Sequence, residues 1–391
     1  MKIVHIMISC FYIEGAGYQE NLLPKAHKRA GHDVTIISSQ YCFNSKYEPL
    51  TRPAGEYIND DGIKVIILPD NKRLPSILGT YQRKCKGLYA TLDNVKPDII
   101  FMHGLTEKDG YDAAKYVSRH SNVILYCDHH QDYYNSAHLN KGLLSKLHFN
   151  LLIKPIAQYI ANYCRMFWGT TPWRVQHLIE VYGIPEEKAD FLVMGADDTK
   201  IHWSDKSELR LAIREKYNIG RDDFLIVTGG KINKEKNIHI LANAVSSNNL
   251  PNVKLLIFGQ PDDATKPLLD CYNNNENIIQ IGWIDSDKVY DIFLSADLGY
   301  FPGTHSVLWE QAVACGLPTV FKLWDGMKHV NVNGNSILQE VITVDTISAL
   351  LSDLIGNTKR MEDMRNAAMN AKNMFCYSEI AKKAIGVENP K

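Results

Sequence analysis

Two lysines stand five residues apart in a glycine-rich loop. The loop, residues 229–237, reads GGKINKEKN and lies between the β-branched run 224–229 and a helical stretch at 238–245. Glycines such as Gly230 at the end of a strand let backbone N–H groups approach a phosphate closely. Lys231 and Lys236 would neutralise a diphosphate as point charges. Taken alone, such a loop is more often a solvated basic turn.

A second loop places one acidic residue at the start of a helical stretch. Glu310 follows the apolar run 297–301, and the turn between them contains Thr304, His305, Ser306 and Val307. Backbone N–H groups in such a turn can meet phosphate oxygens. Glu310 can accept hydrogen bonds from ribose hydroxyls, as acidic residues do in dinucleotide-binding folds. The alternative role is a surface or capping glutamate.

The N-terminal half offers a glycine loop and a cluster of titratable groups. Gly15 and Gly17 lie between the first expected strand and the first expected helix, where they favour a phosphate-binding loop or a simple tight turn. Asp128, His129 and His130 directly follow the apolar run 122–127. Histidine and carboxylate suit several divalent ions, but adjacent residues of a short turn rarely all point inward. We therefore expect no metal site there.

The elements that position these residues alternate along the chain. Near-continuous apolar runs predict parallel strands buried on both faces, and amphipathic stretches between most of them predict helices. The runs form two series: 3–8, 33–38, 63–68, 98–103 and 122–127, then 224–229, 253–258, 278–282, 297–301 and 318–321. The pattern predicts an α/β protein with two Rossmann-like, doubly wound domains that face each other across a cleft. Ligands of such sheets bind at the carboxyl ends of the strands.

A polar stretch near residues 195–206 suits the linker between the two domains. We expect an N-terminal domain over 1–197, joined by a C-terminal helix at 375–391, and a second domain over 198–374. The segment 142–168 is apolar, with spaced basic residues. It has two interpretations: an amphipathic face that touches a membrane surface, or a long helix that packs on the sheet and breaks near Pro155. The second is favoured, because three basic residues are few for a membrane-surface helix.

Composition excludes several classes of protein. The 391 residues carry a formal net charge of −1, which gives no sign of a nucleic-acid binder. Eight scattered cysteines without a Cys-x-x-Cys pair indicate reduced thiols in a cytoplasmic protein. The apolar N-terminus contains His5 and ends in glycines, so we interpret it as a buried strand rather than a signal peptide.

Five segments, in this order, resemble glycosyltransferase family 4, whose GT-B architecture consists of two Rossmann-like domains. The segments are GAGYQENLLPKAHKRAGHDVTII (15–37), VMGADDTKIH (193–202), GGKINKEKN (229–237), IGWIDSDKVYDIFLSADLGYFP (281–302) and WEQAVACGLPTV (309–320). The resemblance covers essentially the whole chain. It implies a retaining, metal-independent transfer from a nucleoside-diphosphate sugar, held by the C-terminal domain, to an acceptor on the N-terminal side.

The resemblance also assigns roles to residues. It implies that Lys231 and Lys236 grip the donor diphosphate and that Glu310 holds the donor ribose. A further family glutamate, which meets the sugar end of the donor, is replaced here by Pro302. Its candidate replacements are polar side chains of the following turn: Thr304, His305 and Ser306. Lys231 stands where the family has arginine, so a bidentate fork on phosphate is lost.

In the N-terminal domain the family places a histidine that faces the donor sugar. His129 and His130 both fit by alignment, and His130 is favoured because Asp128 would then begin the turn as a capping residue. His103 ends another expected strand, where it lines an acceptor pocket or forms a plain turn. The residues 375–386 resemble the family's last helix, which crosses back to the N-terminal domain.

Family members often extend bacterial surface polysaccharides on lipid carriers. The resemblance therefore implies a cytoplasmic enzyme that acts on a glycan or lipid-linked acceptor, with peripheral contact at the inner face of the cell membrane. Two alternatives remain open. One is a nucleotide-sugar epimerase of similar architecture. The other is a catalytically weak partner subunit, which the departures at Lys231 and Pro302 favour.

Overall fold

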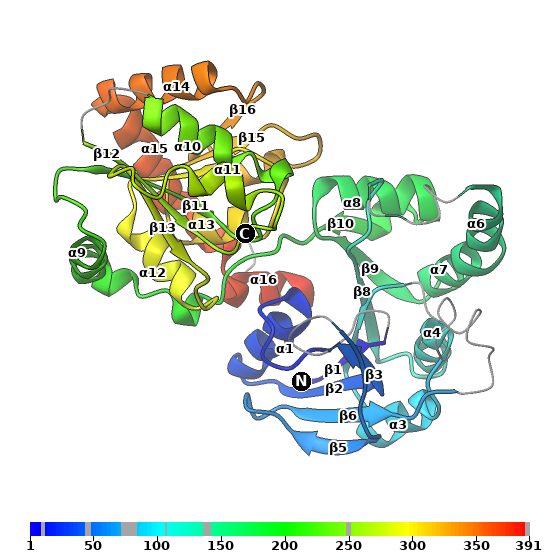
Figure 1. Ribbon diagram of the computed structural model, residues 1–391. Coiled ribbons are helices and arrows are strands. Elements are labelled where there is room, and N and C mark those ends of the chain that lie inside the picture. Colours follow the sequence, from blue (N-terminus) through cyan, green and yellow to red (C-terminus); the bar gives the residue numbers. More distant parts are fainter. Residues whose placement is uncertain are drawn as a thin grey trace. The chain divides into compact units, whose positions relative to one another are not determined.

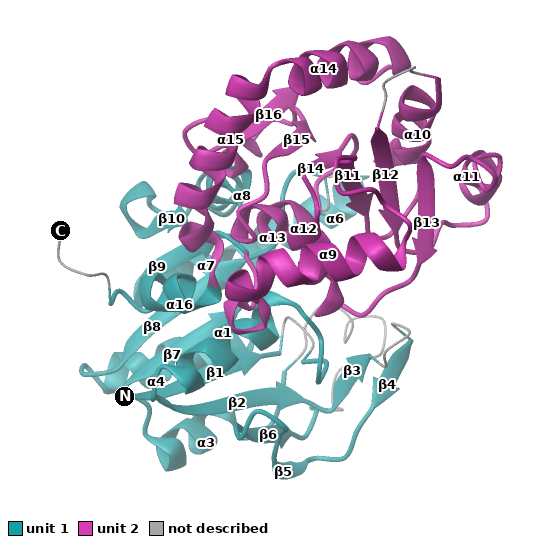
Figure 2. Ribbon diagram, turned by 90° about the vertical axis from the view of Figure 1, so that its left-hand side faces the viewer, with its two compact units in different colours: residues 1–194, 377–391 teal, residues 195–376 magenta. Residues whose placement is uncertain are grey.

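The chain divides into two compact units in a computed structural model. The structure describes residues 1–8, 12–43, 48–71, 84–105, 108–134, 136, 142–247 and 252–387. The first unit combines Met1–Met194 with Tyr377–Lys391, and the second is Gly195–Cys376 (Figure 2). The sequence had placed these boundaries after residues 197 and 374. Ala196 bridges Cys376 within the second unit, and its backbone N–H donates to the Phe375 carbonyl.

A largely parallel sheet forms the centre of the first unit (Figure 1). Its strand order is β10-β9-β8-β7-β1-β2-β6-β5, and only β5 runs antiparallel to its neighbour. β3 and β4 form a separate antiparallel pair. The strands are β1 (Lys2–Met7), β2 (Asp33–Ser39), β3 (Tyr41–Phe43), β4 (Pro49–Thr51), β5 (Gly55–Ile58), β6 (Lys64–Leu68), β7 (Ile99–His103), β8 (Ile124–His129), β9 (Cys164–Gly169) and β10 (Ala189–Phe191).

Helices cover both faces of this sheet, because successive side chains of each strand point to opposite faces. Val4 and Ile6 pack into one core, whereas Ile3 packs into another core with Leu23 and Ile380. The latter core therefore joins the first and last helices of the chain. The α-helices are α1 (Gln19–Arg29), α3 (Leu88–Val95), α4 (Asp109–Arg119), α6 (Gly142–His148), α7 (Lys154–Ala161), α8 (Pro172–His177) and α16 (Tyr377–Ala384).

The segment 142–168 corrects part of the sequence interpretation. Helical structure runs through α6, a π-helical turn at Phe149–Ile153 and α7. Pro155 lacks an N–H, and its ring would clash with the carbonyl four residues earlier. The wider π turn next to it accommodates the proline without ending the helix. The end of the segment is strand β9, not helix, because its side chains from Cys164 onward join the sheet beside β8.

The second unit has its own parallel sheet, in the order β13-β12-β11-β14-β15-β16 (Figure 1). The strands are β11 (Phe224–Gly229), β12 (Val253–Phe258), β13 (Ile278–Gly282), β14 (Leu298–Phe301), β15 (Thr319–Lys322) and β16 (Ser336–Gln339). The α-helices are α9 (Lys206–Lys216), α10 (Ile238–Ser247), α11 (Lys266–Asp270), α12 (Lys288–Ser295), α13 (Leu308–Ala314), α14 (Val344–Gly356) and α15 (Thr358–Ala371).

The two parallel sheets, each flanked by helices, confirm the predicted fold class. All ten predicted strand runs coincide with strands, and the additional strands are mostly short or lie at sheet edges. Seven cysteines are free thiols, and Cys10 lies outside the described residues. Among the described helices, none has the length and apolar character needed to cross a membrane.

Candidate functional site

Two of the predicted donor loops lie side by side in the second unit. They follow β11 and β14, which are hydrogen-bonded neighbours, so their carboxyl ends meet at one edge of the sheet. The Nζ of Lys236 donates to the carbonyls of Thr304 at 2.6 Å and His305 at 3.2 Å. Asn237 donates from Nδ2 to the Pro302 carbonyl at 3.0 Å. The lysine loop is therefore bound to the backbone of the second loop.

Glycines permit this close approach. A Cβ atom on Gly303 would lie 2.2 Å from the Cα of Lys236, so a larger residue would separate the loops. Gly230 has φ +108° and would place a Cβ 2.6 Å from Leu308 Cδ1. Its N–H donates to the Phe258 carbonyl, so Gly230 shapes the loop rather than offering that N–H to a ligand.

The two predicted lysines have different surroundings. Lys231 is exposed, whereas Lys236 is half-buried. Burial lowers the pKa of Lys236 to about 8. A narrow pocket lies beside Lys236 and is lined by residues of both loops and of the strands and helices next to them: Thr228, Gly229, Lys236, Ile238, Phe301, Pro302, Gly303, Thr304, Ser306 and Trp309. The predicted Val307 immediately precedes α13, outside this lining.

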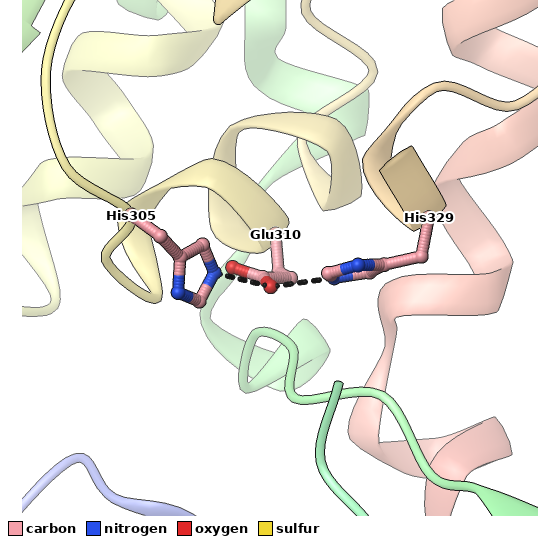
Figure 3. A group of neighbouring side chains, drawn as sticks. All are labelled: His305, Glu310 and His329. Carbon is pink, nitrogen blue, oxygen red and sulfur yellow. Dashed lines mark hydrogen bonds and ion pairs between the residues drawn. The ribbon is translucent and has the colours of Figure 1, made fainter. Parts of the chain in front are cut away.

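Glu310 is fully buried and is held by two histidines (Figure 3). His305 Nε2 donates to its Oε1 at 2.8 Å, and His329 Nε2 donates to the same oxygen at 2.9 Å. Burial opposes ionisation, but the two imidazoles outweigh it and hold the pKa of Glu310 well below its ordinary value. The other oxygen, Oε2, is buried without a hydrogen-bond partner among the described residues.

The three side chains also form a possible metal-ligand set. Their ligand atoms lie within 4.8 Å of one another. Zinc at about 2.0–2.1 Å from tetrahedral ligands would separate those ligands by about 3.3 Å. The two nitrogen–oxygen separations here, 2.8 and 2.9 Å, are shorter and fit protons between the atoms. The geometry therefore corresponds to a doubly hydrogen-bonded carboxylate.

In the first unit, Asp128 is the centre of a buried polar cluster at neighbouring strands β1, β7 and β8. Its Oδ2 accepts from His103 Nδ1 at 2.7 Å and from Gln19 Nε2 at 3.1 Å. Its Oδ1 accepts from the Gly104 N–H at 3.2 Å. Burial would raise the pKa of Asp128, but His103 and His130 outweigh burial and lower it.

The two adjacent histidines point to different neighbours. His130 lies with Nε2 3.4 Å from Asp128 Oδ2, and its side chain is 24% exposed. Burial opposes charging of His130, but Asp128 and Glu20 outweigh it and raise its pKa. His129 is buried, and its Nε2 lies 3.0 Å from Nδ1 of His177. Of the pair, only His130 therefore combines an exposed edge with a contact to Asp128.

The glycine loop of the first unit remains open to solvent. Gly15 adopts φ +76°, and both Gly15 and Gly17 are exposed. A Cβ atom on either glycine would meet no heavy atom within 4 Å among the described residues. The positive φ explains why position 15 is a glycine. Packing does not explain the glycine at position 15 or the one at position 17.

Sequence reasoning singled out His305 and His103 but missed other histidines near these carboxylates. His329 lies nineteen residues beyond Glu310, so no local spacing connects them. His5 and His27 join the Asp128 cluster through hydrogen bonds described below. The available signal was a histidine in each of two expected strands, His5 in 3–8 and His103 in 98–103, because polar residues are unusual in such apolar runs.

Comparison with known proteins gives a family for the second unit. A family model described as Glycosyl transferases group 1 matches residues 210–371. The uncharacterized glycosyltransferase MJ1607 of Methanocaldococcus jannaschii is 21% identical over 226 residues. That match covers 54% of this chain and 56% of the relative, so the chain spans little more than half of the relative's length.

Solved structures match both units. A glycosyltransferase from Rickettsia africae ESF-5 is 16% identical with a TM-score of 0.69, and the match covers 99% of this chain and 97% of that one. Alr3699/HepE from Anabaena, solved in complex with UDP, is 15% identical with a TM-score of 0.66, and the match covers 99% of each chain. At these identities the likeness establishes the fold. The chain therefore carries a domain of the glycosyl transferases group 1 family in residues 210–371 and has the GT-B fold.

Proposed function

We propose that this glycosyltransferase domain uses a nucleoside-diphosphate sugar and transfers the sugar to a hydroxyl of a glycan or lipid-linked acceptor. The observation that carries the proposal is Glu310, a buried carboxylate with one oxygen that accepts from two imidazoles and the other without a hydrogen-bond partner among the described residues. A half-buried lysine, Lys236, lies in the neighbouring loop. An acidic acceptor beside a cationic loop fits a ribose next to a diphosphate.

Lys236 and Lys231 have the charge that the leaving group requires. Departure of a nucleoside diphosphate develops negative charge on its oxygens, and positioned cations stabilise that charge without a metal ion. Lys236 is the stronger candidate, because its carbonyl partners fix its ammonium group in place. Lys231, which is exposed, would add its charge from the rim of the site.

The sugar end of the donor has two sets of candidate partners. Thr304 and Ser306 line the pocket beside Pro302 and are the polar groups available where a glutamate is missing. His305 is engaged with Glu310, so we assign it to the ribose side. In the first unit we assign contact with the sugar to His130, supported by Asp128. Retention of the anomeric configuration follows from the family resemblance.

A peripheral membrane contact is the proposed route to a lipid-linked acceptor. Leu143 and Leu144 are 83% and 82% exposed on α6, and Leu147 and Leu151 are also exposed. Lys146 lies between them in the sequence, where it suits an anionic lipid surface. Apolar side chains of this kind with an adjacent cation match an interfacial helix. We place the enzyme in the cytoplasm, at the inner face of the membrane, in bacterial surface polysaccharide synthesis.

A thermal-shift screen against nucleoside diphosphates and their sugars tests the donor site, with uridine compounds first because the Anabaena structure contains UDP. A ligand of the folded state at a hundredfold excess over its Kd should raise the Tm by roughly 5 °C. Lys236→Ala should abolish the shift. The matched control is Lys359→Ala, an exposed lysine on α15, which should retain it.

The outcome separates the proposal from its alternatives. If no nucleotide raises the Tm, the result would contradict a donor site and favour an inactive partner subunit, for which Pro302 is the motivating feature. A shift accompanied by conversion of the nucleotide sugar without any acceptor would indicate an epimerase. Transfer to an acceptor that persists in the presence of a chelator would support metal-independent chemistry.

A further inference from the structure

Three histidines in the first unit form a continuous hydrogen-bonded chain. His27 Nε2 lies 2.9 Å from the Ala381 carbonyl oxygen of α16, and His27 Nδ1 lies 3.0 Å from His5 Nε2. His5 Nδ1 lies 3.0 Å from His103 Nε2. His103 Nδ1 lies 2.7 Å from Asp128 Oδ2. All three rings are 0–1% exposed, so water does not share these bonds.

The chain requires more protons than neutral rings carry. It contains four hydrogen bonds, and each needs one proton between its two atoms. Three neutral imidazoles bring three protons. A carbonyl oxygen terminates one end and a carboxylate terminates the other, and neither donates when Asp128 is ionised. A fourth proton is therefore needed, either on one ring or on the carboxyl group itself.

The surroundings place this fourth proton on His103. Asp128 also accepts from Gln19 and from the Gly104 N–H, and these donors favour an ionised carboxylate. Burial lowers the pKa of His5 well below its ordinary value and that of His27 to about 4. His103 is the ring in contact with the carboxylate, where a positive charge gains most.

We propose that the chain from Ala381 through His27, His5 and His103 to Asp128 holds one proton more than three neutral imidazoles, as a buried His103–Asp128 ion pair. His5, His27 and His103 are then positioning residues. They fix the carboxylate that faces His130, from the side of the sheet covered by α1 and α16.

The consequence for the reaction rests on the proposed function, in which His130 serves the donor sugar. Other groups act on His130 besides Asp128: Glu20 on α1 favours its charged form, and Arg174 on α8 opposes it. The ion pair with His103 offsets part of the Asp128 charge. Removal of the fourth proton would leave that carboxylate less compensated and so raise the pKa of His130.

Nitrogen NMR of the intact protein with ring-labelled histidine measures the proton count without any activity. An imidazolium gives two similar ring-nitrogen shifts, whereas a neutral ring gives two widely separated ones. At about pH 8.5, two units above an ordinary histidine pKa, one buried ring of the native protein should remain doubly protonated. Neutral signals from every buried ring would overturn the proposal.

His27→Phe tests whether the number of hydrogen bonds among the three histidines is the reason for the fourth proton. Without His27, two neutral rings satisfy the remaining bonds from His5 to His103 and from His103 to Asp128. The doubly protonated signal should therefore be lost at about pH 8.5. Persistence of that signal in a folded variant would show that the hydrogen-bonded histidine chain is not the cause of the double protonation.

A second variant, Asp128→Asn, covers the case in which His27→Phe does not fold. The asparagine amide can donate to His103 Nδ1, so that one bond reverses direction, the other three keep theirs, and all four bonds survive with neutral rings. The imidazolium signal should again disappear. Its survival in Asp128→Asn would contradict an ion pair between these two groups.

The pH profile of kcat/KM then tests the positioning role. In His27→Phe, the limb that reports His130 should move to higher pH by about one unit, whereas a merely structural defect lowers the rate by one factor at every pH. An unmoved limb would contradict the positioning role. If the proposed function is wrong, donor binding fails in the thermal-shift screen while the NMR proton count still stands.

Discussion

Glu310 receives two imidazole N–H groups on a single carboxylate oxygen, and its other oxygen has no hydrogen-bond partner among the described residues. A buried carboxylate oxygen without a protein partner costs free energy unless a donor arrives. Ribose hydroxyls are such donors. The histidines thus matter because they fix the direction in which Oε2 points.

We predict that His329→Phe weakens the affinity for the nucleoside diphosphate by about tenfold or more. The variant removes one hydrogen bond to a charged group, which contributes about 1.5–3 kcal/mol, and frees Glu310 to rotate. Isothermal titration calorimetry measures the change. His329→Gln, which keeps an N–H donor, should retain most of the affinity. Equal affinity in His329→Phe and the native protein would remove His329 from the site.

A second prediction concerns pH and Lys236. Burial lowers the pKa of this lysine to about 8 in the free protein. A diphosphate prefers the charged form, so affinity should be constant below about pH 8 and fall by up to tenfold per unit above it. In Lys236→Arg the fall should disappear, since guanidinium stays charged. A fall that is identical in both proteins would assign the titration to another group.

The chemistry of these residues was only partly readable from the sequence. Taken alone, Lys231, Lys236 and Glu310 were weak signals, and their roles in a donor site came from the resemblance of five ordered segments to a family. The supporting partners were not readable. His329 reaches Glu310 from the loop after β15, and only the pairing of β14 with β15 brings the two together.

At the scale of elements, the helical segment from α6 to α7 shows where local pattern and packing diverge. Its second half packs on the sheet through Ile156, Ala157 and Ile160. Its first half leaves leucines exposed, which core packing does not explain. The sequence contained the apolar residues and Pro155, but hydropathy alone does not distinguish a face that packs from a face that remains uncovered.

We predict that Leu143→Ser combined with Leu144→Ser reduces binding to vesicles that contain anionic lipid by at least tenfold. Each leucine that enters the acyl region contributes about 1.5–3 kcal/mol. The Tm should stay unchanged, because both side chains are more than four-fifths exposed. Co-sedimentation measures binding. Leu211→Ser, on α9 with 49% exposure, is the matched control. Undiminished binding of the double variant would remove α6 from the membrane contact.

At the scale of the whole molecule, the two units differ in whether they consist of one continuous segment or of two. The second unit is one continuous segment with its own sheet and core. The first unit requires the far end of the chain, because α16 supplies Tyr377, Ile380 and Ala384 to its core. The alternation of strands and helices predicted both sheets, since strands buried on both faces read as apolar runs. Short edge strands such as β10 bury too few side chains to be read in this way.

This asymmetry predicts how fragments behave. Residues 195–376 alone should fold cooperatively and bind the nucleotide with an affinity within about threefold of the full chain, since Lys236 and Glu310 both lie inside them. Residues 1–194 alone should fail to fold stably. They lose α16, whose carbonyls accept from His27 and Trp168 and whose apolar face completes a core, and the following Ile385, whose carbonyl accepts from Tyr126. Joining 377–387 to residue 194 by a flexible linker should restore a cooperative thermal transition. If 1–194 unfolds as cooperatively without that segment, α16 is dispensable to the first unit, and the His27 end of the histidine chain is not required for its fold.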